Sequence, residues 1–213
     1  ADPAGAAAAG AAVVALAGAE RPRLVEEMLV QEPAVRIAAL EEIERTGDAE
    51  AARSAVAALG HEDPETACAA VRALAVADES VAAEALPTAL ADERAEVRAA
   101  AAETIARRPA GDARSALSAA VATALVTEPD RAVLRSLLVA ASRIADETMV
   151  EPLTLVLSQE TVPAEADEAA ETLARLSPEA CRRAWMHAPA RAERRWARAL
   201  AAAARAERSQ RST

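Results

Sequence analysis

Several residue types on which many enzymes rely are missing from this 213-residue sequence, which contains no lysine, tyrosine, phenylalanine or asparagine. Without lysine there is no phosphate-loop lysine and no Schiff-base nucleophile, and without tyrosine there is no phenolic acid. The two histidines, His61 and His187, lie 126 positions apart, which leaves little basis for histidine-dependent nucleophilic catalysis. We therefore expect a protein that is not an enzyme and that uses no cofactor.

Cysteine is nearly absent as well. Cys68 and Cys181 are 113 positions apart and form neither a CxxC motif nor a disulfide framework, so we expect free thiols and a cytoplasmic location. Together with His61 and His187, the two cysteines are the candidate ligands for a two-Cys, two-His zinc site. Their gaps of seven and six residues lack the tight ligand spacing of known zinc fingers, so we expect no metal site.

What the sequence has in excess is alanine, which outnumbers leucine more than threefold, while only two residues are aromatic. The missing residue types have A/T-rich codons, which points to a high-GC bacterial genome. Alanine is the best helix former, and strand-forming residues are scarce, so the composition predicts an all-α fold. Because alanine buries little surface, each larger apolar side chain contributes more to stability than usual.

The one long apolar run, residues 4–19, is shorter than the roughly 20 residues that a membrane-spanning helix needs. We assign residues 1–22 to an Ala-rich N-terminal segment, either a terminal helix or a disordered end. A membrane anchor or signal remnant, giving a membrane-associated adaptor, is the alternative.

Five leucines end successive apolar segments at intervals of 30, 31, 35 and 32 positions, and each is followed by an acidic or proline-containing turn. Asp, Ser and Pro at helix starts and Gly at helix ends predict two short helices in each repeat. The five leucines are Leu29, Leu59, Leu90, Leu125 and Leu157. The predicted helices span residues 23–31, 34–46, 48–59, 64–77, 79–91, 94–108, 112–127, 130–145, 147–158, 164–176, 178–187 and 190–208.

The third repeat contains Leu86-Pro87, a turn residue Asp92, then Val97-Arg98, Ala101 and Ile105. This pattern resembles a HEAT repeat, and the resemblance extends over about residues 23–190. Repeat one matches its second half, while Cys68-Ala69 in repeat two and Leu134-Arg135 in repeat four depart from the Val-Arg pattern. Resemblance to the HEAT-like families, which include the phycobilin-lyase type, implies a right-handed α-α superhelix of about five to six helix pairs. The matching residues of the first repeat are Val35-Arg36, Ala39 and Ile43.

In HEAT families the turn aspartate and the arginine of this pattern form a ladder between repeats. The resemblance therefore implies a structural ladder that involves Asp92 and Arg98, with Arg36 and Arg135 at the arginine position of other repeats. Direct contact of these arginines with a partner is the alternative.

Residues 190–213 are expected to form an Arg-rich C-terminal capping helix and tail. Residues 178–213 hold nine Arg and three Glu, whereas residues 1–177 hold 15 Arg and 31 acidic residues. Trp196 and Leu200 form the predicted packing side of the last helix, joined by Trp185 and Met186. The opposite, basic stripe is either a solvated cap, a docking surface, or one end of a head-to-tail self-association. Its members are Arg191, Arg194, Arg195, Arg198 and Arg205.

These observations favour a non-catalytic scaffold that binds proteins along a concave surface formed mainly by the second helices of the pairs. The main alternative is a DNA-binding protein similar to the HEAT-like alkylpurine glycosylases. Such a protein needs a basic groove with aromatic residues, whereas this chain has a net charge of −10. We expect no specific nucleic-acid partner.

Overall fold

The computed structural model is all-α over the residues that it describes, which are 5, 8, 21–109, 111, 113–159, 166–187, 196, 197, 199–201, 204, 205 and 208. Its fold is that of a helical-repeat solenoid. The α-helices are α2 (Arg21–Leu29), α3 (Pro33–Thr46), α4 (Ala49–Ser54), α5 (Pro64–Ala73), α6 (Glu79–Leu90), α7 (Ala95–Arg107), α8 (Arg114–Thr127), α9 (Arg131–Ile144), α10 (Val150–Leu157), α11 (Ala166–Leu176) and α12 (Pro178–His187). The 3-10 helices are η2 (Ala55–Ala58), η3 (Leu74–Val76) and η4 (Glu147–Met149).

The predicted helices from 23–31 to 178–187 correspond to these elements. Three of them are not α-helical throughout, because η2 and η3 replace the last turns expected at 48–59 and 64–77, and η4 replaces the first turn at 147–158. A 3-10 turn tightens a helix end whose backbone groups lack partners four residues away. The predicted helix at 190–208 lies mostly outside the described residues.

Short-range capping explains why the helix starts could be predicted. The Asp63 carboxylate accepts hydrogen bonds from the backbone N–H of Thr66 at 3.0 Å and from that of Glu65 at 3.4 Å, and Pro64 occupies the first helical position. The hydrogen bond from the Thr66 hydroxyl is the main cause that lowers the pKa of Asp63. Asp48 and Asp130 cap α4 and α9 in the same way.

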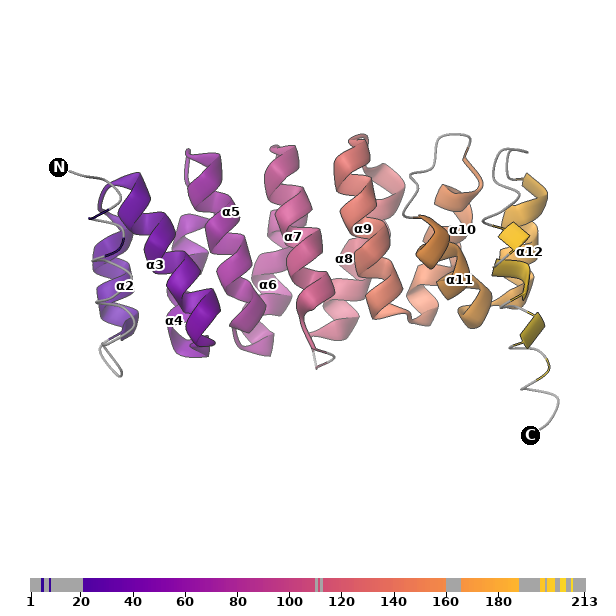
Figure 1. Ribbon diagram of the computed structural model, residues 1–213, viewed down its shortest axis with the longest axis horizontal. Coiled ribbons are helices and arrows are strands. Elements are labelled where there is room, and N and C mark those ends of the chain that lie inside the picture. The colour runs from indigo at the N-terminus through magenta and orange to yellow at the C-terminus, as the bar shows by residue number, and fades with distance from the viewer. Residues whose placement is uncertain are drawn as a thin grey trace. The chain divides into compact units, whose positions relative to one another are not determined.

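The chain divides into an N-terminal unit, residues 1–114, and a C-terminal unit, residues 115–213. In the N-terminal unit the second helices α3, α5 and α7 contact one another in succession and form one layer, with the first helices α2, α4 and α6 behind it (Figure 1). The second helices start at Pro33, Pro64 and Ala95, so that their starts are 31 positions apart in both steps.

This constant period fixes which residues are equivalent in the N-terminal unit. Ala39, Ala70 and Ala101 are equivalent and fully buried, and their small side chains let neighbouring helices approach closely. The Val-Arg position of repeat two is occupied by Thr66-Ala67. The assignment of Cys68-Ala69 to that position was therefore wrong by two residues.

Larger side chains fill the C-terminal unit, in which α10, α11 and α12 contact one another and α9 contacts α11. Trp196 is 1% exposed, as expected for the packing side of the last predicted helix. The expectation that Trp185 and Met186 pack there was wrong, because their exposed fractions are 47% and 66%. Other buried large residues are Leu137, Leu138, Met149, Leu153, Leu157 and Leu173.

None of the helices in the described part of the chain combines the length and the apolar composition needed to cross a membrane. The apolar run at residues 4–19 lies outside the described residues apart from Gly5 and Ala8.

Candidate functional site

The outward sides of α3, α5 and α7 form a continuous surface, called here the second-helix face. On α7 the buried residues Val97, Ala101 and Ile105 follow one another at intervals of four, so the residues between them on the opposite side point outward. The constant period places equivalent side chains on the other two helices. The second-helix face consists of Ala34, Ile37, Glu41, Glu44 and Arg45 on α3, Glu65, Cys68 and Arg72 on α5, and Glu96, Ala99, Glu103 and Arg107 on α7.

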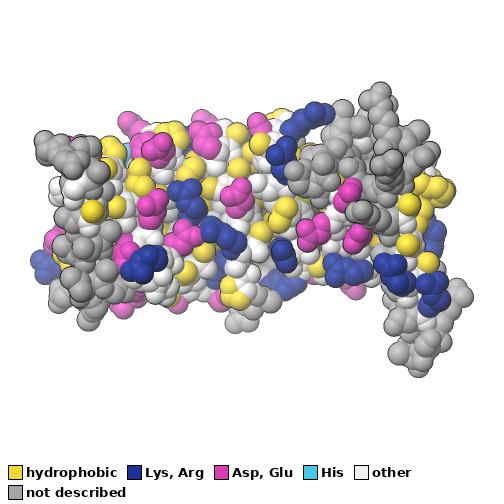
Figure 2. Space-filling model, in the orientation of Figure 1, with side chains coloured by type: hydrophobic (Ala, Val, Ile, Leu, Met, Phe, Trp, Pro, Cys, Tyr) yellow, Lys and Arg dark blue, Asp and Glu magenta, His cyan; other side chains and the backbone are white. Residues whose placement is uncertain are grey.

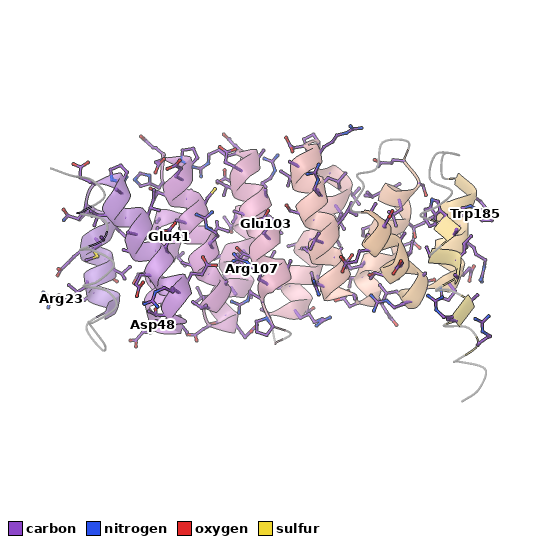
Figure 3. The ribbon with its side chains drawn as sticks, in the orientation of Figure 1. Arg23, Glu41, Asp48, Glu103, Arg107 and Trp185 are labelled. Carbon is purple, nitrogen blue, oxygen red and sulfur yellow. The ribbon has the colours of Figure 1, made fainter. Side chains whose placement is uncertain are left out.

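One row of charged side chains crosses the middle of this face. Glu41 on α3 and Glu103 on α7 lie at a similar height on either side of α5 (Figure 3). Arg72 is the equivalent residue on α5, since it is 31 positions from both. Within the described part of the chain, neither Glu41 nor Arg72 has an ion-pair partner within 4.0 Å. Their charges are therefore available to another molecule.

Near the C-terminal ends of α3 and α7, charged side chains of the face form ion pairs within the protein. Arg107 on α7 contacts the Glu44 carboxylate on α3 at 2.6 Å, although the two residues are 63 positions apart. Arg45 forms a two-point ion pair with the buried carboxylate of Glu42, three residues earlier on the same helix. Acidic and basic side chains consequently alternate over this side of the N-terminal unit (Figure 2).

Arg94 joins the start of α7 to the preceding repeat. Its guanidinium donates to the backbone oxygen of His61 at 2.7 Å and to that of Leu59 at 3.3 Å, while it also binds both carboxylate oxygens of Asp92 at 2.8 Å. The hydrogen bond from Arg94 is the main cause that lowers the pKa of Asp92. Asp92 therefore holds the guanidinium in place, and the guanidinium binds the turn of the earlier repeat.

Arg108 does the same at the end of α7. One nitrogen of its guanidinium donates to the backbone oxygens of Leu74, Ala75 and Ala77 at 2.7–3.0 Å, and another contacts Glu79 at 3.2 Å. Its side chain is only 5% exposed. Sequence reasoning missed Arg94 and Arg108 because both bind backbone oxygens, whose positions a residue pattern does not reveal.

The predicted ladder residues lie in the same turns. Arg98 donates to the backbone oxygens of Asp92 and Glu93 at 2.8 and 2.9 Å, and Arg36 donates to that of Gln31 at 2.6 Å. These contacts fasten each helix to the turn before it. Arg135 is exposed on α9, and a ladder that runs between repeats through Arg36, Arg98 and Arg135 stays a prediction.

Residues 21–106 match the family model for HEAT repeats. These residues therefore form HEAT repeats, and the chain has the fold of a helical-repeat α-solenoid. No curated protein matches its sequence. An engineered protein of solved structure has a TM-score of 0.60 at 19% identity and covers 87% of this chain and 97% of its own. A designed armadillo repeat protein, solved in complex with the peptide (KR)4, has a TM-score of 0.60 at 18% identity, with coverages of 85% and 98%.

Two thiols differ in their position in the solenoid. Cys68 lies half-buried on the second-helix face, whereas Cys181 is fully buried in the C-terminal unit. Burial raises the pKa of Cys68, and it raises the pKa of Cys181 to about 11. Neither thiol is an activated nucleophile, because the reactive thiolate is disfavoured at neutral pH.

The described residues of the solenoid contain no group of three or more His, Cys, Asp and Glu side chains that could hold a metal ion. Of the predicted basic stripe, Arg205 is exposed, and Arg191, Arg194, Arg195 and Arg198 lie outside the described residues.

Proposed function

We propose that this HEAT-repeat solenoid is a non-catalytic scaffold that binds another protein through the second-helix face. The observation that carries the proposal is the regular presentation of side chains on α3, α5 and α7, including Glu41 and Arg72, which have no ion-pair partner in the described part of the chain. Repeat proteins commonly use such extended surfaces to bind partners. A designed armadillo repeat protein of similar fold was solved in complex with a peptide, which supports a peptide or protein as the ligand of such a solenoid.

The charge of the N-terminal unit supports a protein partner over a nucleic acid. Residues 1–114 hold 21 acidic residues and 11 arginines, which gives a net charge of −10. A surface of this sign repels phosphate groups, and binding to a nucleic acid gains most of its affinity from phosphate contacts.

Cys68 offers a direct test of the proposal because it lies on the face itself. The full chain is used to capture binding proteins from the native host, and the thiols are then alkylated with iodoacetamide in the presence and absence of the captured partner. We expect the partner to slow the alkylation of Cys68. Cys181 serves as the internal reference, since it is fully buried.

Two alanine variants complete the experiment. Ala99→Arg places a large charged side chain on the second-helix face, whereas Ala83→Arg makes the same change at a half-buried position of α6. We expect Ala99→Arg to abolish capture and Ala83→Arg to preserve it. A partner that is captured equally by both variants and leaves Cys68 unprotected would show that the partner binds elsewhere.

A further inference from the structure

The arginines of the N-terminal unit leave an acidic excess on the second-helix face. Arg94, Arg98 and Arg108 are bound to backbone oxygens of the turns, and Arg107 and Arg45 are engaged by Glu44 and Glu42. Arg53 and Arg23 form ion pairs with Asp78 and Glu27 away from this face. Arg72 is therefore the arginine of the described face without an ion-pair partner, and it is surrounded by Glu41, Glu65, Glu96 and Glu103.

The middle row of the face presents its charges in the order acidic, basic, acidic. Its members are Glu41 on α3, Arg72 on α5 and Glu103 on α7, and each step crosses from one helix to the next. Packed helices lie roughly 8–10 Å apart, so the row repeats at about that interval. A ligand that pairs with all three residues needs groups of opposite charge at the same spacing.

An extended peptide meets this requirement. In the polyproline II conformation every third side chain points in the same direction, and three residues advance about 9 Å. The row beside the charged row consists of Ile37, Cys68 and Ala99, and its small members on α5 and α7 leave space for the peptide backbone. Glu65 and Glu96, on the far side of that row, favour a ligand that carries a net positive charge.

We infer that the second-helix face binds an extended, net-basic protein segment with a basic residue, an acidic residue and a basic residue at successive third positions. The inference rests on the proposed function and adds the chemistry of the partner. Basic residues pair with Glu41 and Glu103, and the acidic residue between them pairs with Arg72. The pattern reads the same in both chain directions, so it does not depend on the polarity of the bound segment.

Two peptide isomers test the charge order. The matched probe is fluorescein-labelled Arg-Pro-Ala-Glu-Pro-Ala-Arg, and the control is Glu-Pro-Ala-Arg-Pro-Ala-Arg, which has the same composition and net charge. Binding to the full chain is measured by fluorescence anisotropy at low ionic strength, where screening is weakest. We expect the matched probe to bind about tenfold more tightly, because the control replaces two attractive contacts by repulsive ones.

A charge reversal at the centre of the row provides the second readout. Arg72→Glu makes the row entirely acidic, so we expect the variant to prefer Arg-Pro-Ala-Arg-Pro-Ala-Arg over the matched probe. Arg23→Glu is the control, since it makes the same change in net charge at an exposed position of α2. Circular dichroism of each variant verifies that the helices are intact. Equal binding of the two isomers to the unaltered chain, or an unchanged preference in Arg72→Glu, would overturn the inference.

A third probe, the peptide with the sequence of residues 191–198, separates a foreign partner from a second copy of the chain. Weaker binding than that of the matched probe supports the inference, whereas tighter binding overturns it and makes a second copy the occupant. If the isomers bind equally while Ala99→Arg still abolishes capture of the partner, the proposed function stands and the charge pattern is refuted.

Discussion

The two units of the solenoid differ in the side chains that form their cores. In the N-terminal unit the second helices recur with a constant period, and most of the described buried side chains are alanine. In the C-terminal unit leucine, valine, methionine and tryptophan occupy most of the described core. The described core of the N-terminal unit is therefore built from smaller apolar side chains than that of the C-terminal unit.

The polar contacts compensate for this difference. Because alanine buries little surface, close packing of the N-terminal unit gains less from the hydrophobic effect. Arg94 and Arg108 add charged hydrogen bonds to backbone oxygens of the preceding repeat, which are worth more than neutral ones. Both arginines lie at the ends of α7, so together they join this helix to turns of the preceding repeat.

The largest expected effect is that of Trp196→Ala in the C-terminal unit. The indole is 1% exposed, and its removal leaves a large cavity that should lower the free energy of unfolding by about 3–5 kcal/mol. Trp185→Ala is the control, because that indole is half exposed and its removal should cost about 1 kcal/mol or less. Urea unfolding followed by far-UV circular dichroism measures both. Similar losses for the two variants would contradict a core that depends on Trp196.

In the N-terminal unit the comparable change is Arg108→Ala, for which we expect a loss of about 3 kcal/mol. Three backbone oxygens and the Glu79 carboxylate lose their donor at a site where the side chain is 5% exposed. The adjacent Arg107→Ala removes only an exposed ion pair and should cost about 0.5 kcal/mol. Arg108→Lys should recover less than half of the loss, because an ammonium group cannot reproduce the fork of donors.

Both tryptophans belong to the C-terminal unit, so their fluorescence reports on that unit while circular dichroism reports on all helices. We expect Arg108→Ala to shift the dichroism transition more than the fluorescence transition. An equal shift in both signals would mean that the two units unfold as one.

Smaller effects are expected where helices end. Gly47 at the end of α3 and Ala145 at the end of α9 both have the left-handed conformation, with φ of 71° and 48°. The left-handed conformation costs an alanine about 1–2 kcal/mol of folding free energy, whereas a glycine adopts it without this cost. Glycine offsets part of that advantage, because its unfolded chain is more flexible and loses more entropy on folding. We expect Gly47→Ala to destabilise the protein by about 1 kcal/mol and Ala145→Gly to stabilise it by about 0.5 kcal/mol. Thermal unfolding measures both, and a stabilised Gly47→Ala variant would contradict this account.

The features that were predictable from the sequence depend on short-range chemistry. Asp48, Asp63 and Asp146 cap helices through backbone groups two or three residues away, so their positions marked the helix starts correctly. The spacing of leucines predicted the repeats in the same local way. The fold class followed from these two signals together with the HEAT-like third repeat.

The features that escaped prediction depend on three-dimensional placement. The register of repeat two was missed because Thr66 replaces the expected valine, although it is fully buried like its equivalent Val97. Trp185 was expected to pack, but the buried side of α12 runs through Ala180, Cys181 and Ala184 and leaves it at the edge. The row formed by Glu41, Arg72 and Glu103 required the period seen in the structure, since nothing in their immediate sequence connects them.

A pair of buried threonines gives the smallest and most selective comparison of the two units. Thr104 on α7 is fully buried, and its hydroxyl has no hydrogen-bond partner among the described residues. The hydroxyl of Thr172 on α11 instead accepts a hydrogen bond from Arg175 at 3.0 Å. Valine has nearly the same shape without the hydroxyl, so Thr104→Val removes a buried polar group that gains nothing in return. We expect it to stabilise the protein by about 0.5–1 kcal/mol.

The same substitution at Thr172 should destabilise the protein by about 0.5 kcal/mol, the low end for a lost hydrogen bond, because the exposed Arg175 can turn to water. The opposite signs are the essential result, and differential scanning calorimetry of the two single variants and of the double variant measures them. The two sites lie in different units, so their effects should add within about 0.5 kcal/mol. If Thr104→Val were destabilising, its hydroxyl would have a partner in the folded protein, and the alanine-rich layer of the N-terminal unit would contain a polar contact beyond those of its arginines.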